Sequence, residues 1–331
     1  MKTRTAVFVL VVVTFSAAAA PVTARAQKLL VANQTDRTVT VIDFKSGDSD
    51  TVAEDIPGQW GHEIAASADG RRAFLPIYGN SGVGRPGIDG RKLLVIDLGL
   101  NQVTGVVDFG HGVRPHLPVF DHGLLYVTTE LDNAVTIIDP TSLRIIGKVP
   151  TGAQQSHMLV ISRDGKRGYT ANVNSGSVSV LDMAARTTLA VIPVADEIQR
   201  IAISRDDALI FTSDVARPRL AVINTSDRKV KTWVDLPGMG YGAAATPDGR
   251  WLLVAIPAKD MVAVVDLESL QLARTVNVAK SPQEILIRPD GQIAYVSCMA
   301  SGQVAAINLA TWKMDKLLAA GKGADGLAWA R

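Results

Sequence analysis

The sequence predicts an all-β fold, a seven-bladed β-propeller with four antiparallel strands in each blade. The first observation is a short apolar phrase ending in Asp or Asn, which recurs at residues 39–43, 93–97, 135–139, 178–182, 220–224, 262–266 and 304–308. The second is its spacing, because the last residues of these phrases follow one another after 54, 42, 43, 42, 42 and 42 residues. The third is that no long segment has the apolar periodicity of a helix. A repeat near 42 residues that contains several short strands is typical of a propeller blade.

Each repeat contains four predicted strands in a constant order. The first is apolar and ends in a turn that contains Asp-Gly in four repeats, at residues 67–70, 162–165, 246–249 and 288–291. Asp-Gly suits a tight turn because Gly adopts positive φ readily and Asp bonds to the backbone nearby. The second strand lies at residues 73–77, 125–129, 168–171, 251–256 and 294–297. The recurring apolar phrase is the third strand, and the fourth alternates apolar and polar residues, as at 144–149 and 272–278.

The two ends of the repeat region predict how the ring closes. Residues 28–33 read as a second strand with no first strand before it, and residues 326–330 read as a first strand. We therefore expect the C-terminal strand to join the N-terminal blade, as three strands plus one. Closure removes the exposed sheet edges that otherwise invite aggregation. It also sets the predicted number of blades at seven.

The second strands carry a phrase that is similar to a known repeat. Tyr126-Val127-Thr128-Thr129, Tyr169-Thr170-Ala171-Asn172 and Tyr295-Val296-Ser297 each precede the apolar phrase. In this the chain resembles the YVTN-repeat family of bacterial seven-bladed β-propeller proteins, over the whole of residues 27–331. The resemblance implies the fold and not an activity, because similar repeats occur in periplasmic binding proteins, lactonases, haem d1 proteins and components of quinone-dependent oxidation systems. Any of these functions would be an analogy based on the fold.

The first 26 residues have the pattern of a secretory signal peptide. Lys2 and Arg4 form a basic start, an apolar run covers residues 5–15, and small residues lead to Ala24-Arg25-Ala26. A basic region, a short apolar run and an A-x-A site are typical of a cleaved signal. We expect residues 1–26 to be removed, which leaves residues 27–331 as a single propeller domain that is periplasmic or secreted. The apolar run is short for a transmembrane helix, and we expect no membrane span in the mature chain.

Composition limits the classes of partner. The 34 basic and 32 acidic side chains give a formal net charge of +2, and no basic stripe with interleaved aromatic residues indicates nucleic-acid binding. The single cysteine, Cys298, cannot form a disulfide within the chain, so the fold depends on packing. We interpret Cys298 as a buried thiol, because a nucleophilic cysteine needs a base beside it. We expect the protein to be a monomer.

A ring of polar residues is predicted at the mouth of the central channel. The innermost strand of each blade lines the channel, so equivalent residues of successive repeats lie at the same depth. Seven residues before each turn Asp, or its equivalent, the chain has only polar residues: His62, Arg114, His157, Gln199, Tyr241, Gln283 and Asp325. Two positions further on, the residues are apolar except for one histidine: Ile64, His116, Leu159, Ile201, Ala243, Ile285 and Leu327. We therefore expect a polar ring above an apolar plug that His116 interrupts.

The ring and its sequence neighbours predict a metal or ligand site. The imidazoles of His62, His116 and His157 suit Zn, Cu or Fe, which makes these three the candidate metal ligands. A carboxylate from the same region would act as a further ligand or as a general base. The catalytic candidates are Glu63, Tyr241 and Glu284, and the ligand-binding candidates are Arg114, Gln199, Arg200, Tyr241, Gln283 and Asp325.

Two interpretations of these polar residues remain open. In the first, Arg114 and Arg200 bind a carboxylate or another anion bidentately, and Tyr241 donates a hydrogen bond or a proton. In the second, the mouth of the channel is simply wet, the polar side chains are solvated, and His116 bonds to a backbone carbonyl in the core.

Residues 79–90 form an insertion in the second repeat. Their Gly82-x-Gly84-x-x-Gly87 spacing is that of a dinucleotide loop, but no helix follows whose N-terminus would bind the phosphates. We interpret the insertion as a lid or partner-binding loop on the face of the ring, or as a tolerated surface insertion. The sequence has no Cys-x-x-Cys-His motif, which excludes covalently attached c-type haem.

The ring leads to three functional hypotheses. The first is an exported propeller with a ligand- or metal-binding site at the channel mouth, which supports binding alone or chemistry of the hydrolase, lyase or oxidoreductase type. The second is a non-catalytic scaffold that binds a protein or peptide across the same face. The third is the handling of haem d1 or of a quinone cofactor. The sequence does not identify the substrate, the metal or the partner.

Overall fold

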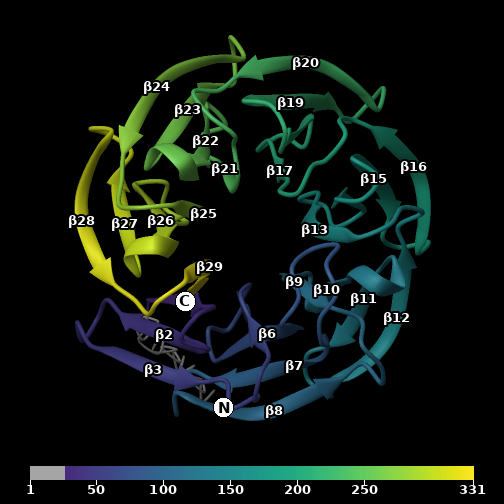
Figure 1. The fold of residues 1–331 in the computed structure, drawn as a ribbon, viewed down its shortest axis with the longest axis vertical. Helices are drawn as coiled ribbons and strands as arrows, with labels where there is room; N and C mark the ends of the chain where they lie inside the picture. The colour runs from purple at the N-terminus through teal and green to yellow at the C-terminus, as the bar shows by residue number, and fades with distance from the viewer. Residues whose placement is uncertain (1–26) are drawn as a thin grey trace, which may run out of the picture.

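In the computed structural model, residues 27–331 form seven antiparallel sheets around a central axis (Figure 1). Six sheets contain four strands, and one contains five because its innermost strand is interrupted. The predicted seven-bladed β-propeller is therefore confirmed. The predicted signal peptide, residues 1–26, lies outside the described residues. Within the part of the chain that the structure describes, no helix has both the length and the apolar character needed to cross a bilayer.

The first four blades have the following strands, in order from the axis outward. Blade 1 contains β29 (Ala324–Ala330), β1 (Lys28–Asn33), β2 (Thr38–Asp43) and β3 (Ser49–Ala53). Blade 2 contains β4 (Trp60–Gly61), β5 (Ala65–Ala66), β6 (Arg72–Gly79), β7 (Asp89–Asp97) and β8 (Gln102–Asp108). Blade 3 contains β9 (Pro115–Asp121), β10 (Leu124–Thr129), β11 (Ala134–Asp139) and β12 (Arg144–Pro150). Blade 4 contains β13 (Ser156–Ile161), β14 (Arg167–Asn172), β15 (Ser177–Asp182) and β16 (Thr187–Pro193).

The other three blades have the same order. Blade 5 contains β17 (Ala202–Ile203), β18 (Leu209–Ser213), β19 (Arg219–Asn224) and β20 (Lys229–Asp235). Blade 6 contains β21 (Ala243–Ala245), β22 (Trp251–Ile256), β23 (Met261–Asp266) and β24 (Gln271–Asn277). Blade 7 contains β25 (Pro282–Ile287), β26 (Ile293–Cys298), β27 (Gln303–Asn308) and β28 (Lys313–Ala319). Short 3-10 helices follow the second strands of blades 3, 6 and 7, namely η1 (Glu130–Asp132), η2 (Pro257–Lys259) and η3 (Met299–Ser301).

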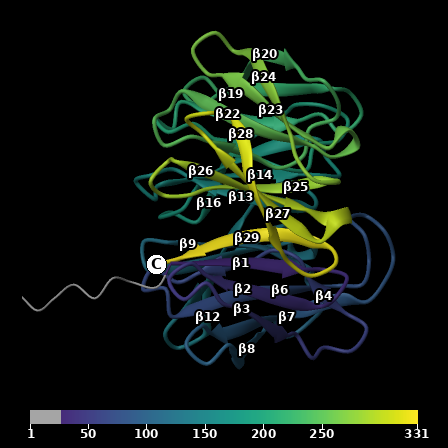
Figure 2. The ribbon, with the colours of Figure 1, turned by 90° about the vertical axis from the view of Figure 1, so that its left-hand side faces the viewer.

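Strand β29 pairs with β1, so the last strand lies in one sheet with the first three. Figure 2 shows β29 directly beside β1. Where blade 1 meets blade 7, the rings of Phe44, Tyr295 and Trp329 stack with centres between 5.5 and 5.8 Å apart. This aromatic stack holds β29 against blade 7, because offset aromatic pairs at this distance are favourable.

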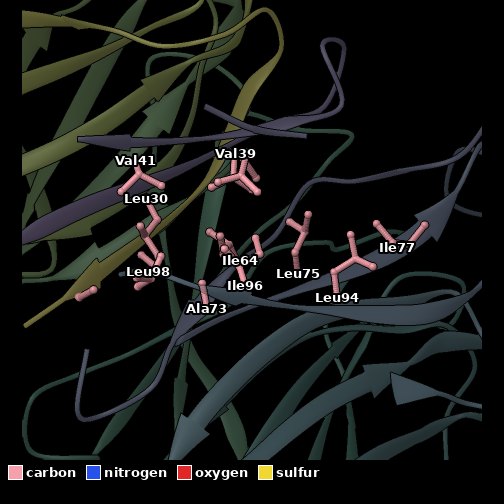
Figure 3. Close-up of a cluster of buried hydrophobic side chains, with 14 residues drawn as sticks. Leu30, Val39, Val41, Ile64, Ala73, Leu75, Ile77, Leu94, Ile96 and Leu98 are labelled. Atoms are coloured by element: carbon pink, nitrogen blue, oxygen red, sulfur yellow. The ribbon is translucent and has the colours of Figure 1, made fainter. Parts of the chain in front are cut away.

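Apolar side chains between neighbouring blades form the core. Figure 3 shows one cluster, in which Leu30 and Val39 of blade 1 lie near Leu75 and Leu94 of blade 2. Successive residues of a strand point to opposite faces of its sheet, and each face of a blade packs against the next blade. The two central strands are therefore nearly continuous apolar runs, while the outer strands alternate between buried and exposed residues.

The recurring Asp or Asn at the end of the third strand caps the turn into the outer strand. Asp139 Oδ1 accepts hydrogen bonds from the backbone N–H groups of Thr141 and Ser142, at 2.8 and 3.2 Å. Asp266 and Asn308 accept equivalent bonds. The repeated phrase therefore has a structural role, and the functional residues must lie elsewhere in the chain.

Candidate functional site

The inner strands lose regular pairing at the channel-mouth end, in the segments that carry the predicted ring. In blade 2 the inner strand is divided into β4 and β5, and His62 and Glu63 lie between the two pieces. In blade 5, β17 begins only after Arg200. Register shifts interrupt the pairing of β29, β9, β13 and β25 with their second strands. Irregularities of this kind re-aim side chains, so residues next to the predicted ring can also face the axis.

Arg200 is the centre of a buried ion-pair network. Its Nη1 atom donates hydrogen bonds to Glu63 Oε1 at 2.5 Å and to Glu284 Oε2 at 2.9 Å. Its Nη2 atom lies 3.4 Å from Asp325 Oδ1. The guanidinium carbon also lies 4.5 Å from the centre of the Tyr241 ring, within the range of a cation–π interaction. The network therefore brings together five of the predicted residues, from blades 1, 2, 5, 6 and 7.

The carboxyl groups of this network outnumber its cation. The side chains of Arg200, Glu63 and Asp325 are 2 to 3% exposed, whereas that of Glu284 is 21% exposed. Burial raises the pKa of Glu63, and it raises the pKa of Glu284 to about 8, although the charge of Arg200 acts in the opposite direction. A buried charge is stable only when it is paired. Three carboxyl groups around one guanidinium therefore require protons or a further cation.

Three histidines lie beside this network. The ring centres of His62 and His116 are 4.6 Å apart with planes at 72°. Those of His116 and His157 are 3.6 Å apart with planes at 30°, so these two rings stack. The Tyr78 ring meets all three imidazoles in T-shaped contacts at 5.4 to 6.5 Å. His116 and His157 are each 1% exposed, and together these rings form one packed cluster.

Each imidazole has its Nδ1 atom next to a hydrogen-bond acceptor. His62 Nδ1 lies 3.1 Å from Asp325 Oδ2, and His116 Nδ1 lies 3.1 Å from the backbone carbonyl of His157. His157 Nδ1 is hydrogen-bonded to the carboxylate of Glu130. In a neutral ring the proton is then on Nδ1, and the lone pair of Nε2 is free. Among the described residues, the Nε2 atoms of His116 and His157 are buried and have no hydrogen-bond partner.

The surroundings keep two of the imidazoles neutral. Burial lowers the pKa of His116 well below its ordinary value, and the neighbouring His157 and His62 lower it further. Burial also lowers the pKa of His157, against the effect of Glu130. Burial acts in the same direction on His62, but the hydrogen bond and charge of Asp325 outweigh it and raise the pKa of His62. Neutral imidazole is the form that binds metal ions.

His62, Glu63 and His116 each place one donor atom within 4.8 Å of the others. Two imidazole nitrogens and a carboxylate oxygen are a common donor set for zinc and for other divalent first-row ions. An acceptor on the second nitrogen of a ligating histidine is the usual outer shell of such sites. His157 lies outside this group of donor atoms and stacks on His116, although the sequence predicts all three histidines as ligands.

Two residues of the cluster, Tyr78 and Glu130, are not among the predicted site residues. Glu130 is buried, pairs with His157 through one oxygen, and accepts the hydroxyl of Tyr78 at 2.8 Å through the other. Tyr78 lies near the end of β6, and Glu130 follows the end of β10. Second strands end on the channel-mouth face, so this position is the signal that would have identified them. The predicted ring includes inner-strand positions only.

Arg114 connects the rim of the channel to the insertion. Its Nε atom donates to Asp89 Oδ1 at 2.6 Å, and its Nη2 atom donates to the carbonyl of Arg85 at 2.8 Å. Its guanidinium carbon lies 6.0 Å from the centre of the Tyr78 ring. The insertion therefore contacts the predicted ring, and its two ends are included in β6 and β7. Both Arg114 and Arg200 pair with protein acceptors. The buried Nε atom of Arg200 has no hydrogen-bond partner among the described residues.

Gln199 and Gln283 are predicted ring residues that the structure does not bring into the network. Gln283 Nε2 donates to the carbonyl and to the hydroxyl of Ser281, at 3.3 and 3.1 Å. Gln199 is partly exposed in the irregular segment before β17. Cys298 is buried, and burial raises the pKa of its thiol to about 11. Such a thiol is protonated at neutral pH and is a poor nucleophile.

Comparison with known proteins supports the fold. No family model and no curated protein matches the chain. The solved structure of Kuenenia stuttgartiensis hydrazine synthase is similar, with a TM-score of 0.73 and 19% identity, over 86% of this chain and 92% of that chain. Dihydro-heme d1 dehydrogenase NirN in complex with DHE is similar with a TM-score of 0.65 and 14% identity, over 91% of this chain and 74% of that chain. At these identities the similarity shows the propeller fold alone.

Proposed function

We propose that this protein binds a divalent transition-metal ion at the mouth of its central channel. The observation that carries the proposal is the group of donor atoms of His62, Glu63 and His116, which lie within 4.8 Å of one another. The buried Nε2 atom of His116, which has no partner among the described residues, supports it, because native proteins rarely leave buried polar atoms unpaired. The excess of carboxyl groups around Arg200 supports a positively charged occupant.

The proposal assigns different roles to the predicted catalytic residues. Glu63 acts as a metal ligand together with His62 and His116. Glu284 is the carboxyl group of the network that a bound molecule can reach, since its side chain is 21% exposed. Its raised pKa, about 8, suits proton transfer near neutral pH. Tyr241 contacts Arg200 through its ring and keeps the guanidinium in place. The donor set suits Zn²⁺ and also Cu²⁺, Ni²⁺ and Fe²⁺.

The proposal is tested by metal titration of the purified protein. After treatment with a chelator and dialysis, the wild type is expected to bind one Zn²⁺ or Co²⁺ ion per chain in competition with a coloured chelator. His62→Ala and His116→Ala are each expected to abolish stoichiometric binding. His111→Ala is the matched control, because His111 is exposed and pairs with Asp132. A wild type that binds no ion, or a pair of variants that bind as the wild type does, would show the proposal to be wrong.

We further infer that the chain is an exported, monomeric member of the YVTN-repeat propellers. The signal-like pattern of residues 1–26 and the repeated Tyr-Val-Thr-like phrases support this inference. Expression with the complete chain is expected to yield a periplasmic or secreted protein that begins at Gln27, as measured by mass spectrometry. A protein that retains residues 1–26 in the cytoplasm would contradict export.

A protein- or peptide-binding scaffold is the second candidate. Ile88 of the insertion, Leu131 of η1 and Met239 before β21 are exposed apolar residues in loops on the channel-mouth side, and such residues are common in docking surfaces. Binding of a partner by metal-free protein, lost on Leu131→Glu and Met239→Glu, would favour this candidate. Handling of haem d1 is less well supported, because His116 and His157 are 1% exposed and a macrocycle needs open access to its ligand.

A further inference from the structure

His157 has a free acceptor atom that the proposed metal site does not use. Its Nε2 atom is buried and has no hydrogen-bond partner among the described residues. The ring of His157 stacks on that of His116, with centres 3.6 Å apart and planes at 30°. The group of donor atoms that could hold an ion consists of His62, Glu63 and His116 and does not include His157. His157 Nε2 is therefore left available to a molecule bound beside the metal.

The tautomer of His157 makes this atom an acceptor and not a donor. Glu130 accepts a hydrogen bond from the Nδ1–H group, and the hydroxyl of Tyr78 donates to the other oxygen of Glu130 at 2.8 Å. Glu130 is itself buried. A buried carboxylate that holds Nδ1–H leaves the lone pair on Nε2. The Tyr78–Glu130–His157 chain thus fixes the orientation of the His157 ring and leaves Nε2 as a buried acceptor.

The charges around the cluster do not favour an anion over a neutral molecule. Glu63, Glu284, Asp325 and Glu130 surround the histidines, and Arg200 is the cation that faces them. Both Nη atoms of Arg200 contact carboxyl groups of the protein, whereas its buried Nε atom has no hydrogen-bond partner among the described residues. With a divalent ion bound, these charges nearly balance. A buried anion would therefore gain no net attraction there and would still lose its hydration, a cost that is much smaller for a neutral molecule.

From these observations we propose that the metal site takes a small neutral molecule with an N–H or O–H group on, or next to, its metal-binding atom. The classes that fit are small neutral amines, hydroxylamines and alcohols. The N–H or O–H group of the molecule would bond to Nε2 of His157, while the same atom or its neighbour would bind the metal. His157 is then a ligand-binding residue, and Glu130 and Tyr78 are positioning residues. This inference rests on the proposed metal site.

The test compares two probes on cobalt-loaded protein. Co²⁺ affinity is measured first for each variant, and the probe titrations are then made at saturating Co²⁺ and followed by the visible spectrum of the ion. Hydroxylamine is the neutral probe with donor hydrogens, and azide is the anionic probe without them. The wild type is expected to bind hydroxylamine more tightly than azide. His157→Phe is expected to weaken hydroxylamine binding about tenfold, which is the effect of one lost hydrogen bond. The same variant is expected to leave azide binding nearly unchanged.

Two further variants make the result decisive. His157→Phe leaves the buried charge of Glu130 unpaired. The double variant Glu130→Gln/His157→Phe removes that charge, so the probe titrations can be made on it if the single variant folds poorly. His122→Ala is the control, since His122 is exposed and pairs with Asp121, and it is expected to bind both probes as the wild type does. Azide binding as tight as hydroxylamine binding, or unchanged hydroxylamine affinity in both His157 variants, would overturn the inference while leaving the metal site intact. A wild type that binds no Co²⁺ would overturn the proposed function itself.

Discussion

The Nδ1 atom of His62 lies 3.1 Å from Oδ2 of Asp325, across 263 residues of sequence. This contact joins the interrupted inner strand of blade 2 to β29, the strand that pairs with β1. Asp325 raises the pKa of His62 against the effect of burial, and its contact with Nδ1 leaves Nε2 of His62 for the proposed ion. Asp325 therefore belongs to the outer shell of the proposed metal site.

Asp325→Asn is expected to weaken metal binding about 10- to 100-fold, the usual effect of removing the partner of a ligating histidine. It is also expected to lower the pKa of His62, because the carboxylate no longer favours the charged ring. Competitive Zn²⁺ titration and NMR titration of the histidine measure the two effects. Asp132→Asn is the matched control, since Asp132 pairs with the exposed His111. Equal losses of metal affinity in both variants would argue against the outer-shell role of Asp325.

Arg200→Met is expected to destabilise the fold strongly. The substitution leaves Glu63, Glu284 and Asp325 without their shared cation, and breaking a buried pair from one side costs about 3 to 5 kcal/mol. The free energy of unfolding in urea measures the loss. Arg91→Met removes the exposed pair with Asp108 and is expected to cost less than about 1 kcal/mol. Similar values for both variants would show that the network contributes little to stability.

From the raised pKa of Glu284 we expect a specific dependence of the free energy of unfolding on pH. Its pKa is about 8 in the folded protein, against an ordinary value of 4.5. Between these values the folded protein holds a proton that the unfolded chain has released, so the stability from this group is complete at low pH and is lost as the pH rises toward 8. In metal-free protein, Glu284→Gln is expected to become progressively more stable relative to the wild type from pH 5 to pH 8. Urea unfolding at four pH values measures this difference, and a constant difference would contradict the prediction.

Gly326 lies where neighbouring blades approach closely. A Cβ atom there would lie 2.5 Å from the carbonyl oxygen of His62 and 2.6 Å from the Cα atom of Glu63. Gly326→Ala is therefore expected to cost about 1 to 3 kcal/mol, as overpacking usually does, and to displace two proposed ligands. Thermal unfolding and Zn²⁺ titration measure both effects. Gly82→Ala in the insertion is the control, because its Cβ would meet only the flexible Arg85 side chain, at 3.4 Å or more.

The blades could be predicted from the sequence because their signals are local. A third strand that ends in a turn-capping Asp, and an inner strand that ends near Asp-Gly, recur with nearly constant spacing. These phrases depend on hydrogen bonds within a few residues, as at Asp139. Any chain with this pattern must place its inner strands around a common axis. The same alignment drew attention to His62, His116 and Asp325, which the structure brings together.

The details of the site could not be predicted, because they depend on contacts between blades. The backbone N–H groups of Gly326 and Gly242 donate to the carbonyls of His62 and Gln283 in the next blade. Regular alternation would turn Glu63 and Glu284 away from the ring positions beside them. The irregular inner strands instead bring both to Arg200. No local pattern predicts such a bond between residues of different repeats.

The pairing of β29 with β1 has a consequence for the biogenesis of the protein. His62 leaves the ribosome early, and its partner Asp325 follows 263 residues later. A nascent chain therefore lacks the outer-shell partner of His62 until the end of translation, so the proposed ion would be bound tightly only once the ring has closed. Tight metal binding would then indicate that folding is complete. A chain whose ring fails to close would have exposed sheet edges and no tightly bound ion.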